Sequence, residues 1–112
     1  MKRILVIGGG SWGTALSRLL IENGHKVFLW EYNEEIRKDI RSTGENRIFL
    51  PGIKLPEELL LVDDYCEVLR EEEKYGNIDV ILLATPTQFL RPILKRLKKC
   101  LNYTIIIVNV AK

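Results

Sequence analysis

The chain has 112 residues, a length typical of one domain that can bury its own hydrophobic core. Its composition is ordinary for a soluble globular protein, and its net charge of +2, from 17 basic and 15 acidic residues, gives no support to nucleic-acid binding. No stretch approaches the roughly 18 apolar residues of a membrane span, and no signal peptide is evident, so we predict a cytoplasmic protein that does not enter membranes.

The first half of the chain alternates apolar runs with amphipathic segments. Residues 4–7 form a continuous apolar run that stops at glycine, which is typical of a strand buried on both faces. The next segment carries apolar residues at helical spacing and ends at Asn23-Gly24, which predicts a helix. Residues 27–30 predict a second strand, and residues 34–43 predict a charged helix.

The alternation resumes after an irregular stretch at 45–58, which contains several breakers. The remaining predicted strands are residues 59–62, 79–84 and 105–108. The remaining predicted helices are residues 63–74, which Asp63 or Asp64 could cap, and residues 87–99. Five strands joined by crossovers imply a parallel sheet. We therefore predict an α/β fold: a doubly wound parallel sheet of the Rossmann type, with five strands, in a single domain over residues 1–112.

A glycine-rich turn connects the first strand to the first helix. Gly8, Gly10 and Gly13 match the spacing G-x-G-x-x-G, and they stand where that spacing has a structural meaning. Gly8 would allow a tight turn, Gly10 would leave room for a pyrophosphate, and Gly13 would let the helix approach the strand. Backbone N–H groups at the helix start would then face the phosphates. We predict that this turn binds a dinucleotide; the alternative is a glycine turn without a ligand.

An acidic residue follows the second strand. Glu31 lies 18 residues after Gly13, close to the spacing at which a carboxylate binds the ribose of NAD. Such a carboxylate would repel the 2′-phosphate of NADP, so Glu31 favours NAD as the cofactor. A solvated charge at a strand end is the alternative interpretation.

With these residues placed, the sequence resembles the NAD(P)-dependent glycerol-3-phosphate dehydrogenases. The segments that carry the resemblance are GGGSWGTAL at 8–16, Asn46 with FLPGIKLP at 49–56, ATPTQFLR at 84–91 and VAK at 110–112. The resemblance spans the whole chain but only the N-terminal third of the family's length. It implies the dinucleotide-binding domain of an oxidoreductase that transfers a hydride between sn-glycerol 3-phosphate and NAD(P), giving dihydroxyacetone phosphate.

The resemblance also implies roles for individual residues. Ser11 and Trp12 would contact the cofactor at the glycine turn, while Tyr32 and Phe89 match aromatic positions that flank it in some members. Lys112 matches a lysine near the nicotinamide and the substrate, where an ammonium group could steady developing charge. Many bacterial members carry an arginine at the position of Tyr32 or Asn33 that suits NADP, and its absence here again favours NAD.

The family's C-terminal domain supplies the catalytic base and most of the substrate pocket, and the chain lacks it. We therefore expect the chain to bind cofactor without turning over substrate by itself; a homodimer is possible. Two alternatives stay open: a stand-alone NAD-sensing module, and the cofactor domain of another hydroxy-acid or sugar-nucleotide dehydrogenase.

Three further side chains receive less specific predictions. Cys66 and Cys100 lie far apart without a CxxC pattern, so we expect free thiols and neither a metal site nor a disulfide. Thr14 could reach a phosphate or pack within the first helical turn, and the sequence does not decide between these roles.

Overall fold

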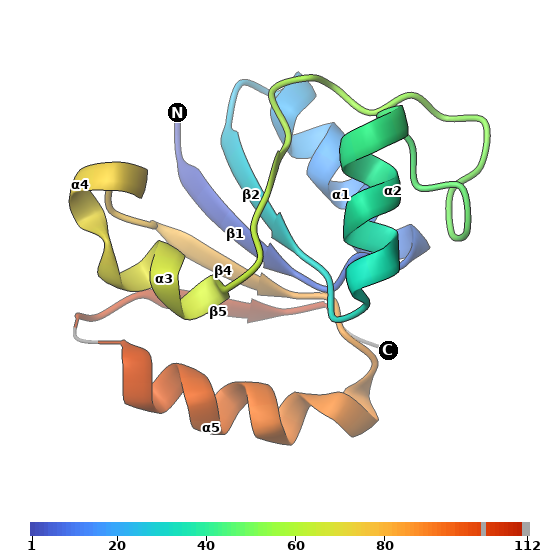
Figure 1. Ribbon diagram of the computed structural model, residues 1–112. Coiled ribbons are helices and arrows are strands. Elements are labelled where there is room, and N and C mark those ends of the chain that lie inside the picture. The colour runs from blue at the N-terminus through green and yellow to red at the C-terminus, as the bar shows by residue number, and fades with distance from the viewer. Residues whose placement is uncertain (102, 111–112) are drawn as a thin grey trace.

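The computed structural model describes residues 1–101 and 103–110 of the chain (Figure 1). The strands are β1 (Arg3–Ile7), β2 (Lys26–Trp30), β3 (Leu60–Leu61), β4 (Val80–Leu83) and β5 (Ile106–Asn109). The helices are α1 (Ser11–Glu22), α2 (Glu34–Thr43), α3 (Tyr65–Arg70), α4 (Glu72–Tyr75) and α5 (Leu90–Cys100), with a 3₁₀ turn, η1 (Thr87–Phe89), before α5. None of these helices is long and apolar enough to cross a membrane.

The five strands form one parallel sheet in the order β3-β2-β1-β4-β5. The predicted α/β class and the doubly wound parallel sheet are therefore confirmed. From β1 the chain first proceeds outward through β2 and β3, and then crosses back to place β4 on the other side of β1. The carboxyl ends of β1 and β4 thus flank the point at which the strand order reverses, which is where open α/β sheets bind their ligands.

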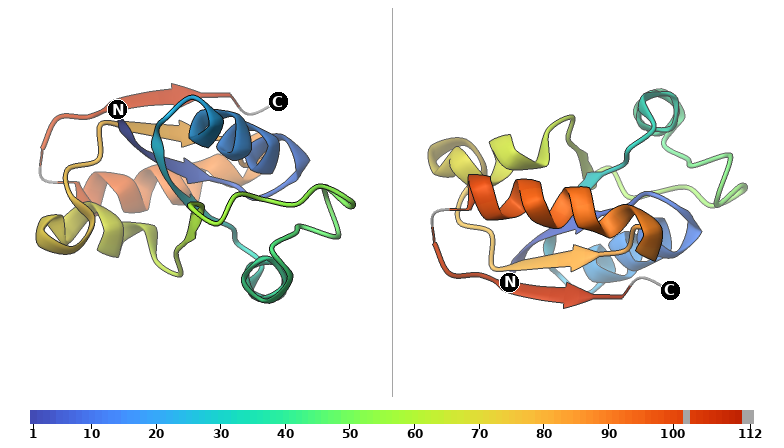
Figure 2. Two further views of the ribbon diagram at one scale, coloured as in Figure 1. Left: turned by 90° about the horizontal axis from the view of Figure 1, so that it is seen from above. Right: turned by 90° about the horizontal axis from the view of Figure 1, so that it is seen from below.

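Helices cover both faces of the sheet, which explains why β1 is apolar from Ile4 to Ile7. Leu5 and Ile7 belong to a buried cluster beneath α3 and α5, whereas Ile4 and Val6 belong to a second cluster beneath α1 and α2. Figure 2 shows α1 in front of the sheet in one view and α5 in front of it in the opposite view. Successive side chains of a strand point to opposite faces, so a strand between two helical layers needs apolar residues at every position.

The predicted helix over 63–74 is broken into two short helices. Glu71 has a ψ of 74°, outside the helical range, and separates α3 from α4. Of the two predicted caps, Asp64 occupies the position: its side chain accepts a hydrogen bond from the backbone N–H of Cys66 at 2.9 Å. The predicted helix over 87–99 begins with the 3₁₀ turn η1 and is regular from Leu90.

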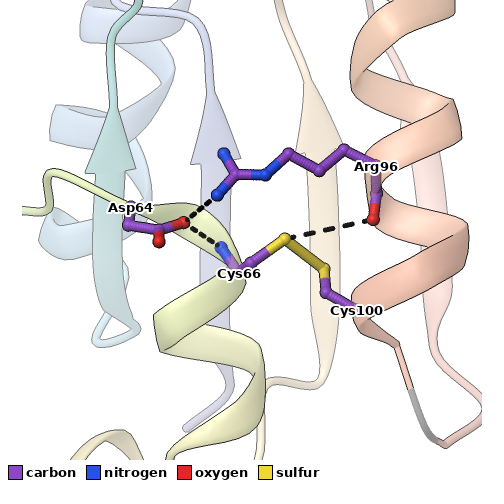
Figure 3. The surroundings of a disulfide bond; sticks show 4 residues. All are labelled: Asp64, Cys66, Arg96 and Cys100. Carbon is purple, nitrogen blue, oxygen red and sulfur yellow. Dashed lines mark hydrogen bonds and ion pairs between the residues drawn. A yellow bond between two sulfur atoms is a disulfide. The ribbon is translucent and has the colours of Figure 1, made fainter.

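The expectation of free thiols is wrong, because Cys66 and Cys100 form a disulfide (Figure 3). Cys66 lies at the start of α3 and Cys100 at the end of α5, and these two helices pack against each other over the same face of the sheet. Their Cα atoms are 5.7 Å apart, within the range that a disulfide bridges. Their 34-residue separation along the chain hides this proximity, which arises only from the packing of the two helices.

We expect reduction of this disulfide to lower the free energy of unfolding by about 3 to 4 kcal/mol, because a cross-link that closes a loop of this length restricts the unfolded chain. Chemical unfolding with and without dithiothreitol measures the change. The double variant Cys66→Ser, Cys100→Ser is the control: it should unfold like the reduced protein and show no response to dithiothreitol. Equal stability of the oxidised and reduced protein would contradict the expectation.

Candidate functional site

The glycine-rich turn lies between β1 and α1, at the carboxyl end of the central strand. Gly8 has a φ of 120°, and a Cβ atom there would lie 2.6 Å from the backbone nitrogen of Thr85. A Cβ atom on Gly13 would lie 1.8 Å from the carbonyl oxygen of Gly8. By contrast, a Cβ atom on Gly10 would meet nothing within 4 Å. Two of the three glycines are thus required by the turn itself, while Gly10 faces open space.

The start of α1 carries backbone N–H groups that no side chain caps. Gly10 is the N-cap residue, and its conformation is extended. The first N–H groups of any helix lack acceptors within the helix, and they give its N-terminus a partial positive charge. Ser11, the first helical residue, is exposed beside them. An uncapped helix start next to an open glycine is suited to an anionic ligand such as a diphosphate.

The side chain of Trp12 connects this turn to the residue that follows the edge strand β5. Its indole Nε1–H donates a hydrogen bond to the carbonyl oxygen of Val110 at 3.1 Å, although β4 lies between β1 and β5. Trp12 as a whole is 46% exposed. Trp12 therefore holds Val110 close to the glycine turn. Lys112, the predicted catalytic residue, lies outside the described residues.

The structure also brings Glu31 to the turn, from the end of β2. One carboxylate oxygen accepts the N–H of Gly9 at 2.9 Å, and the other accepts the N–H of Asn33 at 2.6 Å. These bonds fix the direction of the carboxylate and place a negative charge beside the glycine turn. Each carboxylate oxygen can accept a further hydrogen bond, so the group can still bind a ribose hydroxyl.

The two aromatic residues predicted to flank a cofactor both follow strands at the carboxyl edge of the sheet. Tyr32 follows β2 and is 82% exposed, and its ring meets that of Trp30 edge to face. Phe89 lies in η1, after β4, and is 56% exposed. The structure thus assembles the glycine turn, Ser11, Trp12 and Glu31 at one place and leaves these two rings exposed on neighbouring segments.

Two polar residues lie beneath the turn, and the sequence did not assign them a role there. Thr14 is fully buried, and its hydroxyl donates to the carbonyl oxygen of Gly9 at 3.1 Å, so it supports the turn from inside. Asn46 is also fully buried and contacts the same carbonyl oxygen. Asn46 stands in a segment that carries the family resemblance, but nothing in its local sequence indicates that the segment folds against residue 9.

An ionic cluster of Arg37, Arg41 and Asp63 contacts the backbone at the end of β2. The guanidinium group of Arg37 donates to the carbonyl oxygens of Glu31 and Tyr32 and also to the carboxylate of Asp63. Asp63 additionally pairs with Arg41 at 2.9 Å. The hydrogen bond and charge of Arg41, followed by those of Arg37, hold the pKa of Asp63 below its ordinary value despite some desolvation. Arg37 is thus engaged with the protein itself, next to the residue that we predict to select the cofactor.

Within residues 1–101 and 103–110, no group of three or more His, Cys, Asp or Glu side chains is arranged to hold a metal ion. The groups that the described residues bring together at the turn are backbone N–H groups, the Glu31 carboxylate and exposed aromatic rings. The parallel sheet, its reversal of strand order and the open glycine turn define a dinucleotide-binding domain of the doubly wound α/β class.

Comparison with known proteins identifies the family within this class. The family model of the NAD-dependent glycerol-3-phosphate dehydrogenase N-terminus matches residues 3–112. The chain therefore belongs to this family, whose model describes the N-terminal part of the glycerol-3-phosphate dehydrogenases. This assignment confirms the resemblance found in the sequence.

Individual relatives agree with the assignment. The chain is 39% identical over 112 residues to a glycerol-3-phosphate dehydrogenase, NAD(P)+, of Geobacillus thermodenitrificans, and 39% identical over 111 residues to that of Citrifermentans bemidjiense. These alignments cover 100% and 99% of the chain and 31% of each relative. The crystal structure of glycerol-3-phosphate dehydrogenase from Coxiella burnetii superimposes with a TM-score of 0.87 at 29% identity, over 99% of this chain and 32% of that one. The chain thus spans about a third of the length of these relatives.

Proposed function

We propose that residues 1–112 form the cofactor domain of an enzyme that transfers a hydride between C2 of sn-glycerol 3-phosphate and NAD, giving dihydroxyacetone phosphate. The observation that carries the proposal is the open position at Gly10, beside an uncapped helix start and between the carboxyl ends of β1 and β4. Family membership and the names of the relatives support the substrate. When bound, NAD supplies the hydride acceptor, and the fold supplies binding and orientation.

In this proposal each residue of the turn has a physical task. The N–H groups at the start of α1 hold the diphosphate, aided by the helix dipole. Gly8 and Gly13 keep the turn tight enough to present those groups, Ser11 and Trp12 border the ligand, and the exposed rings of Tyr32 and Phe89 flank it. Lys112 holds the anionic substrate and opposes developing negative charge. The predicted homodimer and the cytoplasmic location stay predictions.

We further propose that the cofactor is NAD and that NADP binds more weakly. The Glu31 carboxylate is held beside the turn by two backbone N–H groups, and a fixed negative charge there repels a 2′-phosphate. Arg37, a cation close to this position, is engaged with two carbonyl oxygens and with Asp63. The Glu31 carboxylate thus offers an acceptor for ribose hydroxyls. The Arg37 guanidinium group is bonded to the protein itself and is not directed at a 2′-phosphate.

Titration calorimetry with NADH and NADPH tests this proposal. We expect the wild-type chain to bind NADH at least about tenfold more tightly than NADPH, because like charges in contact are strongly unfavourable. Glu31→Gln removes the charge and should bring the two dissociation constants together. Glu34→Gln, a change to an exposed carboxylate on α2, is the matched control and should leave both constants unchanged. Tighter binding of NADPH by the wild-type chain would refute the assignment to NAD.

A further inference from the structure

The side chain of Asn46 is a fully buried amide that joins a distant loop to the glycine turn. Its Nδ2 group donates to the carbonyl oxygen of Gly9 at 2.7 Å and to the hydroxyl of Thr14 at 3.0 Å. Its Oδ1 atom accepts the backbone N–H of Phe49 at 3.1 Å. Every hydrogen-bonding atom of the amide is therefore engaged, and the contact with Phe49 determines which end of the amide faces the turn.

The loop that carries Asn46 is itself held in place by the backbone. The N–H of Leu55 donates to the carbonyl oxygen of Gly44 at 2.7 Å, and Glu45 forms an isolated antiparallel bridge with Lys54. The N–H of Leu50 donates to the carbonyl oxygen of Asn46 at 2.8 Å. The position of Asn46 beneath the turn is thus fixed by the closure of this loop.

These contacts fix the orientation of the peptide group between Gly9 and Gly10. The carbonyl oxygen of Gly9 accepts hydrogen bonds from both Asn46 and Thr14, so it points into the protein. On the other side of the same residue, the N–H of Gly9 donates to Glu31. The described residues contain no cis peptide bond. In a planar trans peptide the C=O and N–H bonds point in opposite directions, so an inward Gly9 carbonyl turns the Gly10 N–H outward.

We propose that Asn46 is a positioning residue for diphosphate binding: it holds the Gly9–Gly10 peptide so that the Gly10 N–H faces the ligand. The inference rests on the proposed function, because it assigns this N–H to the diphosphate of the cofactor. Gly10 is the position at which the turn is open. The outward N–H of Gly10 therefore lies where there is room for a phosphate oxygen to accept its hydrogen bond. Without the Asn46 amide, the Gly9 carbonyl loses the shorter of its two side-chain hydrogen bonds, and only the Thr14 hydroxyl still holds it inward.

Asn46→Asp is the most direct test. The substitution keeps the shape of the side chain and the oxygen that accepts from Phe49, but it places an oxygen where the donor to Gly9 stood. The probes are ADP, which carries a diphosphate, and adenosine, which does not. We expect the variant to bind ADP about tenfold or more weakly, because a hydrogen bond to a charged group is misplaced, and to bind adenosine as the wild type does. Asn46→Leu removes the same donor without adding a charge that would repel a diphosphate, and it should weaken ADP binding in the same direction. Thr14→Val, which removes the second donor to the Gly9 carbonyl, should also weaken ADP binding.

A stability-matched control separates positioning from general loosening. Val68→Ala removes buried volume on the opposite face of the sheet, in the cluster beneath α3 and α5. It should lower the unfolding temperature and leave both dissociation constants unchanged. Wild-type affinity for ADP in folded Asn46→Asp, or equal weakening of ADP and adenosine, would overturn the inference.

A measurement on the wild-type chain covers the case in which the variant does not fold. Titration with inorganic pyrophosphate, followed by amide NMR, should shift the Gly10 resonance more than those of exposed amides away from the turn. An unchanged Gly10 amide would overturn the inference. A wild-type chain that binds neither NADH nor ADP would instead refute the proposed function, so the two failures are distinguishable.

Discussion

Gly13→Ala is expected to lower the free energy of unfolding by about 2 to 3 kcal/mol and to abolish measurable NADH binding. Alanine favours a helix over glycine by about 1 kcal/mol, so propensity alone predicts a gain in stability. The new Cβ atom, however, would lie 1.8 Å from the carbonyl oxygen of Gly8. Backbone must therefore shift, and an overpacked site of this kind costs more than the gain in propensity.

Denaturant unfolding and calorimetry with NADH measure the two effects. Leu19→Ala, at an exposed position of the same helix, is the control and should change neither quantity appreciably. If Gly13→Ala were as stable as the wild type and bound NADH equally well, α1 would not need its close approach to the turn.

Gly10→Ala is expected to weaken NADH binding by at least about tenfold while lowering the stability by less than about 1 kcal/mol. The backbone of Gly10, with φ −68° and ψ −174°, is accessible to alanine. A Cβ atom there meets no protein atom within 4 Å. The methyl group would instead occupy the space through which we propose that the diphosphate approaches the N–H groups.

The contrast between these two alanine variants is the decisive result. Both add one side-chain methyl group to the same turn, yet we expect Gly13→Ala to impair folding and binding and Gly10→Ala to impair binding alone. The same unfolding and calorimetric measurements serve for both variants. A Gly10→Ala variant with wild-type NADH affinity would show that the ligand does not approach the turn at this position.

Most of the fold could be predicted from local patterns. Continuous apolar runs identified β1, β2 and β4, because a strand covered on both faces has no polar side. The helix predicted over 34–43 has the observed bounds. In the structure, Asn33 caps its start and Gly44, with a φ of 73°, ends it. The break at Glu71 was missed, because no proline or glycine marks it.

Part of the candidate site could also be predicted from the sequence, and part of it could not. The glycine spacing and Glu31 could be found in the sequence, because a tight turn and a strand-end carboxylate follow local rules. The contact between Trp12 and Val110 and the cluster around Arg37 could not, because each joins residues separated by many positions along the chain.

By itself, the sequence determined the parallel α/β class, the glycine turn and the family resemblance, since each depends on the order and spacing of neighbouring residues. Tertiary structure alone decided that Cys66 and Cys100 join as a disulfide and that the amide of Asn46 supports the turn. The physical reason is the same in both cases. These contacts depend on how helices and loops pack in three dimensions, and no local pattern encodes the distance between segments that meet only when the sheet is covered.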